Sequence, residues 1–234
     1  MERTKTGIKG FDELINGGFP RGSTILLSGG PGTGKTIFGL TYLYVGAKEY
    51  NEAGLYITLE ENLKNIVWNM ETFGWDIASL QATSKFRIYK MNLHTEENVE
   101  AQIKEELKVI ARLVKEMGCK RLVVDSTTAM GVWISEIGKI RHMLYTFADS
   151  LKEFGCTTIL IAETKGDKTE YSAFGVEEFI VDGVIMLYFN PPNRAIFVRK
   201  LRGTNHSKKV HPFTITEFGI EVRPKDEIVW EALK

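Results

Sequence analysis

Apolar segments of strand length alternate with longer helical patterns through the first 165 residues of the chain. The strand-like segments are bounded by glycine or polar residues, as is typical of strands buried in a sheet. They are STILLSG (23–29), AGLYITLE (53–60), KFRIYKMN (85–92), RLVVDS (121–126) and TTILIAET (157–164). Strands that alternate with helices in this way predict an α/β fold, with helices covering both faces of a mostly parallel sheet.

Helical periodicity fills the intervals between these strands. Helices are predicted over residues 36–50, 62–75 and 137–154. A longer amphipathic helix is predicted to stop at Gly118, because glycine commonly follows the last helical turn. Its apolar positions recur at helical spacing, namely Ile103, Leu107, Ile110, Val114 and Met117.

The character of the sequence changes after Thr164. The segment KGDKTEYSAFG (165–175) is polar and contains glycine, so it is predicted to be a loop. The shorter segments that follow are FIVDGVIMLYF (179–189), RAIFVRKLRG (194–203), HPFTITEFGI (211–220) and EVRP (221–224). They predict antiparallel strands that extend one edge of the sheet. We expect one domain over residues 1–234, because single α/β domains of this length are common.

Composition and charge restrict the possible functions. The chain has 30 basic and 30 acidic residues, and this balance argues against a surface covered by nucleic acid. Cys119 and Cys156 lack the spacing of metal ligands, so we interpret them as buried apolar residues. No run of about 18 apolar residues predicts a membrane span, and the first ten residues lack an apolar signal core. A cytosolic protein is therefore expected.

The strongest chemical signal is the segment GGPGTGKT (29–36), called the phosphate loop below. It fits the Walker A pattern G-x-x-x-x-G-K-[ST] and lies between a predicted strand and a predicted helix, as that pattern requires. Glycines let successive backbone N–H groups point at phosphate oxygens, and the helix adds the positive end of its dipole. Lys35 is predicted to reach the β- and γ-phosphates, and the Thr36 hydroxyl to bind Mg²⁺. The other predicted nucleotide-binding residues of the loop are Gly29, Gly30, Pro31, Gly32, Thr33 and Gly34.

Three acidic residues follow predicted strands and extend this interpretation. Asp125 ends the apolar strand RLVVD and fits the Walker B carboxylate that holds Mg²⁺. Glu60 and Glu61 follow the second strand, at the edge where α/β folds bind ligands. One of them could orient or deprotonate the water that attacks the γ-phosphate. The alternative is that both carboxylates decorate the start of the next helix, where the helix dipole favours acids.

In the segment VRKLRGTNH (198–206), the cations Lys200 and Arg202 stand at alternating positions. On a strand they would point to the same side. Positive charge could neutralise the γ-phosphoryl group during its transfer. Spacing alone, however, favours two solvated residues on an edge strand.

At the level of whole motifs, the chain resembles a known family. The segment TGIKGFDELINGGFPRGSTILLSGGPGTGKT (6–36) resembles the start of RecA-superfamily ATPases of the KaiC type, and more distantly RadA. The likeness covers nearly the whole chain and continues through LEEN, FGWD, VVDS, GVEEFIVDGVI, KLRGTNH and HPFTITEFGI. It implies a RecA-like P-loop NTPase fold that binds ATP or ADP with Mg²⁺. It also implies a homo-oligomer, expected to be a hexameric ring with ATP at the subunit interfaces.

The resemblance assigns roles to particular positions. It implies that Glu60 and Glu61 are catalytic carboxylates. It implies that the KLRGTNH segment reaches the nucleotide of the neighbouring subunit, with Lys200 and Arg202 as catalytic residues. The further nucleotide-binding residues that it implies are Thr72, Thr204 and His206.

One departure from the family bears on function. The second half of KaiC is autophosphorylated on a Ser-Thr pair, whereas Glu178 and Phe179 occupy those positions here. Without a hydroxyl to accept phosphate, autokinase activity of the clock type is not expected.

Three functions remain open at this point. An ATPase ring could undergo conformational changes that an unidentified protein partner reads. A RecA- or RadA-like nucleic-acid motor is the alternative, but the loops after Asp125 and Thr164 lack the unopposed Lys or Arg that phosphate binding requires. A small-molecule kinase is disfavoured, because no acceptor pocket or lid is recognisable. We therefore favour the ATPase ring and consider nucleic acid an unlikely partner.

Overall fold

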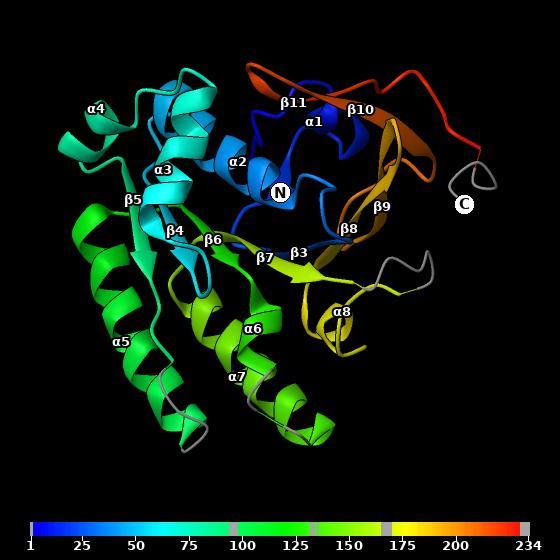
Figure 1. Ribbon diagram of the computed structural model, residues 1–234. Helices are drawn as coiled ribbons and strands as arrows, with labels where there is room; N and C mark the ends of the chain where they lie inside the picture. Colours follow the sequence, from blue (N-terminus) through cyan, green and yellow to red (C-terminus); the bar gives the residue numbers. More distant parts are fainter. Residues whose placement is uncertain (1, 94–97, 132–133, 135, 165–169, 230–234) are drawn as a thin grey trace.

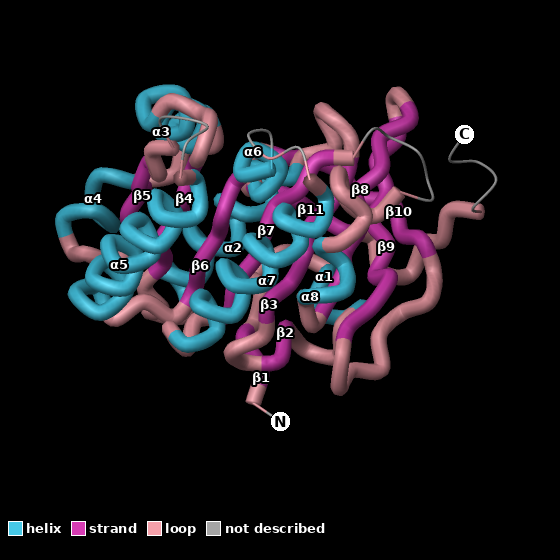
Figure 2. Tube along the Cα trace, turned by 90° about the horizontal axis from the view of Figure 1, so that it is seen from below, coloured by secondary structure: helices cyan, strands magenta, loops and turns pink. Residues whose placement is uncertain are grey.

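A computed structural model describes residues 2–93, 98–131, 134, 136–164 and 170–229. Within these residues a nine-stranded sheet runs through the molecule in the order β11-β10-β9-β8-β3-β7-β6-β4-β5 (Figures 1 and 2). A small antiparallel pair, β1 (Arg3–Thr4) and β2 (Phe19–Pro20), stands apart from this sheet and was not predicted.

The strands divide into a parallel part and an antiparallel part. The parallel strands are β3 (Thr24–Gly29), β4 (Gly54–Thr58), β5 (Phe86–Lys90), β6 (Arg121–Asp125), β7 (Thr157–Glu163) and β8 (Gly183–Asn190). The antiparallel strands that follow β8 are β9 (Asn193–Leu201), β10 (Val210–Thr216) and β11 (Gly219–Val222). The predicted α/β class and the antiparallel extension of one edge are confirmed, except that β8, formed by the first segment predicted as antiparallel, is parallel to β3.

Helices cover both faces of the sheet (Figure 1). One face packs against α1 (Phe11–Leu14), α2 (Lys35–Glu49), α3 (Leu63–Thr72) and α4 (Ile77–Ala82). The other face packs against α5 (Val99–Met117), α6 (Thr127–Gly131), α7 (Ile137–Glu153) and α8 (Glu177–Ile180). Successive strand residues alternate between the two cores: Ile25 and Leu27 lie in the first, and Leu26 lies in the second. This alternation explains why the central strands read as unbroken apolar runs.

Two parts of the carboxyl-terminal prediction were wrong in detail. The segment predicted as a strand from residue 179 begins as α8, and β8 starts only at Gly183. Glu177 and Glu178 form the first turn of that helix, where acids interact favourably with the helix dipole. The segment 211–220 is divided between β10 and β11 by a turn at residues 217–218.

The two cysteines are buried, as predicted. Cys119 is 4% exposed and Cys156 is 1% exposed. Burial raises the pKa of the Cys119 thiol to about 12 and that of the Cys156 thiol to about 11, so both are protonated at neutral pH. Among the described residues, no cluster of His, Cys, Asp and Glu forms a ready metal site. No helix in the described ranges has both the length and the apolar character needed to cross a bilayer.

A buried guanidinium joins α2 to the start of β6. Arg121 is fully buried, and its Nε donates to Glu52 Oε2 at 2.8 Å while Nη1 donates to the Tyr42 carbonyl at 2.9 Å. The guanidinium also lies 4.6 Å from the centre of the Tyr42 ring. Gly46 of α2 leaves room for it, because a Cβ at that position would lie 2.3 Å from Arg121 Nε. A charge at this depth is tolerated because the Glu52 carboxylate compensates it.

Removing the carboxylate should therefore destabilise the fold. We expect Glu52→Gln to lower the free energy of unfolding by about 3 kcal/mol, because it leaves a buried positive charge uncompensated. Glu52 also pairs with the more exposed Arg21 at 3.1 Å, so Arg21→Ala is the matched control. That control should lose less than about 1 kcal/mol. Equal losses for both variants in urea unfolding would contradict the assignment of stability to Arg121.

Candidate functional site

The phosphate loop joins β3 to α2. Gly32 and Gly34 have φ angles of 72° and 98°, in the left-handed region that glycine adopts without strain. Lys35, the first residue of α2, is 8% exposed. Its Nζ donates to the carbonyls of Gly29 and Gly30, each at 2.9 Å. The loop thus curls around its own ammonium group, and burial lowers the pKa of Lys35.

Thr36 and Asp125 meet beside this loop. The Thr36 hydroxyl donates to Asp125 Oδ2 at 2.8 Å, and the Tyr56 hydroxyl donates to the same oxygen at 2.5 Å. Burial raises the pKa of Asp125, while these two hydrogen bonds and the charge of Lys35 lower it in part. A hydroxyl and a carboxylate oxygen are the hard ligands that Mg²⁺ prefers. The pair is therefore suited to hold the magnesium ion of a bound nucleotide.

The structure separates the two adjacent glutamates. Glu61 lines the pocket at the phosphate loop, and its Oε1 accepts a long hydrogen bond of 3.4 Å from Asn69 Nδ2. Burial, followed by the charge of Asp125, raises the pKa of Glu61. Glu60 is exposed, and its Oε2 lies 3.4 Å from the Ser126 hydroxyl. The sequence could not rank these two residues, whereas their placement puts Glu61 in the pocket and Glu60 outside its lining.

The pocket has a volume of about 590 Å³ and a lining of two chemical kinds. Lys35, Thr36 and Asp125 are polar lining residues, and Thr72 also lines the cavity. The apolar lining residues are Ile37, Leu40, Phe73, Trp75 and Ile215. Trp75 stacks with Tyr44 at a centroid distance of 4.8 Å and with Phe73 at 5.0 Å. Charged groups for phosphates and apolar groups for a base are both needed to bind a nucleotide.

Two charged residues of this pocket escaped the sequence interpretation. Glu163 ends β7, paired with Gly29, and a search of every strand end for acids would have found it by the rule that found Asp125. Arg194 is the second residue of β9, and its Nη2 lies 3.4 Å from the Gly32 carbonyl. No local signal marks Arg194, because only the antiparallel pairing of β9 with β8 brings it to the phosphate loop.

The predicted cations of the same strand lie at its other end. Lys200 pairs with Val184 and Leu201 with Gly183, whereas Gly29 pairs with Leu187. Four residues along β3, from Ile25 to Gly29, separate these levels, which corresponds to about 13 Å. Lys200 and Arg202 therefore lie far from the phosphate loop of the same chain.

The expectation that Lys200 and Arg202 point to the same side of one strand is only partly met. β9 ends at Leu201, so Arg202 lies beyond the strand and is exposed. Lys200 instead donates to the carbonyls of Val181 at 2.7 Å and Glu178 at 3.1 Å. The two side chains thus have different surroundings.

Thr204 and His206 also lie away from the pocket lining. The Thr204 hydroxyl accepts a hydrogen bond of 3.1 Å from Arg3. His206 is 8% exposed, with Nδ1 2.8 Å from the Ser207 carbonyl and Nε2 3.0 Å from Lys208 Nζ. The structure thus brings the phosphate loop together with Asp125, Glu61 and Thr72, and places the KLRGTNH segment elsewhere.

Comparisons with known proteins show the family to which the chain belongs. A family model for the KaiC ATPase matches residues 4–227. A UPF0273 protein of Methanocaldococcus jannaschii is 36% identical over 238 residues, covering 96% of this chain and 97% of the relative. The circadian clock oscillator protein KaiC of Parathermosynechococcus lividus is 34% identical over 96% of this chain, which spans 43% of that protein. The crystal structure of a KaiC-like protein from Pyrococcus horikoshii superposes with a TM-score of 0.85 at 41% identity, covering 95% of this chain and 99% of that one.

The raised pKa of Glu61 leads to a prediction about stability. A carboxyl whose pKa is higher in the folded than in the unfolded chain makes the folded state lose stability as pH rises through that interval. Glu61→Gln should therefore raise the Tm of the nucleotide-free protein at pH 7. The gain should disappear as pH falls toward about 4, where glutamate itself becomes protonated.

The control is Glu71→Gln, which removes an exposed carboxylate from the neighbouring helix α3. This variant should leave Tm nearly unchanged at both pH values. A lower Tm for Glu61→Gln at pH 7, measured by calorimetry, would show that the Glu61 carboxylate stabilises the free protein instead.

Proposed function

The chain belongs to the KaiC family of ATPases, and from this premise we propose that it is a Mg²⁺-dependent ATP hydrolase whose active sites are completed between subunits. The observation that carries the proposal is the convergence of Lys35, Thr36, Asp125 and Glu61 on one pocket. A strand, a loop and a helix amino terminus create this convergence, and each contributes a different part of the chemistry.

The phosphate loop is proposed to bind the phosphates of ATP. Its backbone N–H groups and the amino terminus of α2 face the phosphate oxygens, as in other phosphate loops. Lys35 then exchanges its two carbonyl partners for the β- and γ-phosphates. Thr36 and Asp125 hold Mg²⁺, which would neutralise charge on the phosphates.

Glu61 is proposed as the principal catalytic carboxylate. Its position in the pocket lets it orient the attacking water and accept a proton from it. The raised pKa of Glu61 favours that proton transfer near neutral pH. Glu60, outside the lining, is proposed to support the site through Ser126. Glu163 and Asp125 add negative charge at the same edge of the sheet, which favours a divalent cation there.

The cations at the end of β9 are proposed to act on the nucleotide of a neighbouring subunit. Their distance from the phosphate loop of the same chain argues against action within one subunit. Arg202 is exposed, so its guanidinium is available to a neighbour. A ring of such subunits, proposed to be a hexamer, would place Lys200, Arg202, Thr204 and His206 at each nucleotide.

The biological role is proposed to be regulatory. Nucleotide-driven changes in the ring would be read by a protein partner in the cytosol. The neutral net charge argues against a nucleic-acid partner. The two loops considered for nucleic-acid contact fall partly outside the described residues, at 132–133, 135 and 165–169.

Nucleotide binding should depend on the phosphate loop. Lys35→Ala should weaken ATP binding at least about tenfold and abolish measurable hydrolysis, because a positive charge facing the phosphates is lost. Lys64→Ala, which removes an exposed cation from α3, should retain wild-type affinity. Isothermal titration with ATP and Mg²⁺ measures the affinity of both variants, and a steady-state ATPase assay measures their hydrolysis. Undiminished binding and turnover in Lys35→Ala would contradict the proposed function.

A mixing experiment tests the completion of sites between subunits. Arg202→Ala and Glu61→Gln should each be nearly inactive alone, since an arginine supplied in trans contributes about 10³–10⁵ in rate. In mixed assemblies, some interfaces combine an intact Glu61 with an intact Arg202, so activity should partly return. Subunit exchange must be demonstrated independently, for example by mass spectrometry of labelled subunits. No recovery despite proven exchange would mean that Arg202 does not act across the interface.

A further inference from the structure

Asp182, between α8 and β8, joins the segment that carries Arg202 to the centre of the fold. We propose that Asp182 is a positioning residue, which holds Arg202 in place for the nucleotide of the neighbouring subunit. The inference rests on the proposed function, because it assigns a second residue to the same interfacial site. It goes further by stating how one subunit keeps its arginine ordered before the neighbour arrives.

Asp182 contacts Arg202 through both its main chain and its side chain. The Arg202 N–H donates to the Asp182 carbonyl at 2.9 Å. Arg202 Nη1 lies 3.5 Å from Asp182 Oδ1, the closest approach of this ion pair. This contact engages one end of the guanidinium, and the side chain of Arg202 remains 61% exposed. The other guanidinium nitrogens can therefore face a phosphate while Asp182 keeps its hold.

Asp182 is itself fixed to the central strand β3. Its N–H donates to the Thr24 carbonyl at 2.8 Å, and its Oδ2 accepts from the Thr24 N–H at 3.0 Å. Thr24 is 1% exposed and begins the strand that leads to the phosphate loop. The anchor is therefore as rigid as the core of the sheet. A long side chain loses less entropy on binding when such an anchor already orders it.

The same carboxylate gathers a second cation from another element. Lys152, near the end of α7, places Nζ 3.4 Å from Asp182 Oδ2. Lys200 lies nearby, since burial and then the charge of Arg202 lower its pKa while Asp182 raises it. Three cations so close together would repel one another in the free subunit. Asp182 offsets part of this repulsion and leaves a surplus of positive charge for an anion.

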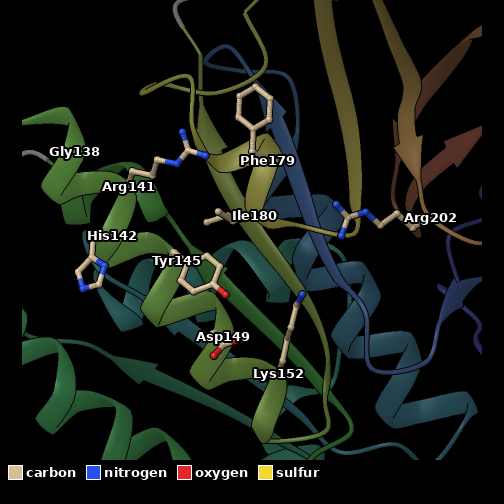
Figure 3. Close-up of a pocket in the computed structure, with 9 residues that line it drawn as sticks. All are labelled: Gly138, Arg141, His142, Tyr145, Asp149, Lys152, Phe179, Ile180 and Arg202. Carbon is tan, nitrogen blue, oxygen red and sulfur yellow. The ribbon is translucent and has the colours of Figure 1, made fainter.

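Two of these cations, Lys152 and Arg202, border an open pocket of about 540 Å³ between α7, α8 and the residue after β9 (Figure 3). Lys152 rises from α7 and Arg202 reaches in from the opposite side, so that their nitrogens approach the same part of the cavity. Arg141 adds a third positive charge to the wall, and Asp149 adds one negative charge. Phe179 of α8 is 61% exposed beside them. A cationic, partly apolar cavity of this kind fits the phosphate end of a nucleotide held by a second copy of the chain.

A purely structural role for Asp182 is the alternative, because its contacts with Thr24 also stabilise β3. The two roles differ in which subunit has the impaired nucleotide site. A positioning defect impairs the site on the neighbour, whereas a structural defect at β3 impairs the phosphate loop of the same subunit. Mixed assemblies distinguish these outcomes.

The test uses Asp182→Asn, which removes the charge but keeps an oxygen that accepts from the Thr24 N–H. We expect kcat to fall at least about tenfold, since small misplacements of catalytic groups have effects of this size or larger. KM for ATP should change little, because the nucleotide is bound mainly by the other subunit. Glu153→Gln, which removes an exposed carboxylate from the last turn of α7 outside the pocket lining, should leave kcat unchanged.

Mixing then assigns the defect to one side of the interface. Asp182→Asn mixed with Glu61→Gln should regain activity, because some interfaces combine an intact Glu61 with an intact Asp182 and Arg202. Asp182→Asn mixed with Arg202→Ala should regain none, because every interface then lacks a proper arginine. The reverse pattern, or a kcat equal to wild type, would overturn the inference. If the Asn variant does not fold, Asp182→Glu, which keeps the charge but displaces it, takes its place in the same two mixing experiments.

These results also separate the inference from the proposed function. If Arg202→Ala retains the full rate, the completion of sites between subunits is wrong. If Arg202→Ala loses the rate while Asp182→Asn retains it, only the role of Asp182 is wrong.

Discussion

The parallel pairing of β3 with both β7 and β8 determines where the chemistry of this molecule lies. A parallel sheet directs the carboxyl ends of its strands to one edge, where ligands of α/β folds bind. The phosphate loop leaves β3 at that edge, and Asp125 ends β6 two strands away. Thr36 follows the phosphate loop that leaves β3, and β7 pairs with both β3 and β6. Asp125 reaches the Thr36 hydroxyl because these pairings fix the register of β6 relative to β3. The candidate metal ligands and the phosphate loop therefore depend on the same backbone hydrogen bonds as the core.

The reversal of direction at β9 divides the site between two ends of the sheet. β8 runs with β3 and β9 runs against it, so one strand starts at the phosphate loop and finishes far from it. Arg194 lies at the near end and Arg202 at the far end. An isolated subunit thus carries a phosphate loop without the far cations, and a set of cations without a phosphate loop beside them. The proposed head-to-tail association of identical copies would unite the two, and such association closes into a ring where its rotation permits closure.

Much of the fold could be predicted from the sequence because its signals are local. Apolar strands, helical periodicity and the glycine pattern of the phosphate loop each depend on a few neighbouring residues. Asp125 could be predicted because the end of an apolar strand is visible in the sequence. The short helix α8 was missed because its four residues, Glu177–Ile180, are too few to show a helical period and its last two adjoin an apolar segment.

The remaining features depend on contacts between distant segments. The sequence could not distinguish Glu60 from Glu61, since adjacent residues differ here only in the direction of their side chains. The positions of Arg194 and Asp182 depend on the register of β8, β9 and β3, which no local sequence pattern encodes. Lys200 was expected to point with Arg202 but instead caps the carbonyls of α8 and the residue after it.

The central claim is that hydrolysis requires two subunits at each nucleotide. The most direct measurement is the steady-state ATPase rate per subunit as a function of protein concentration, with the mass of the assembly measured under the same conditions by sedimentation. The account predicts that the rate per subunit falls toward zero as the assembly dissociates into monomers. ATP affinity should fall much less, because the phosphate loop is intact in each monomer. A monomer that hydrolyses ATP at the full rate per subunit would contradict the account.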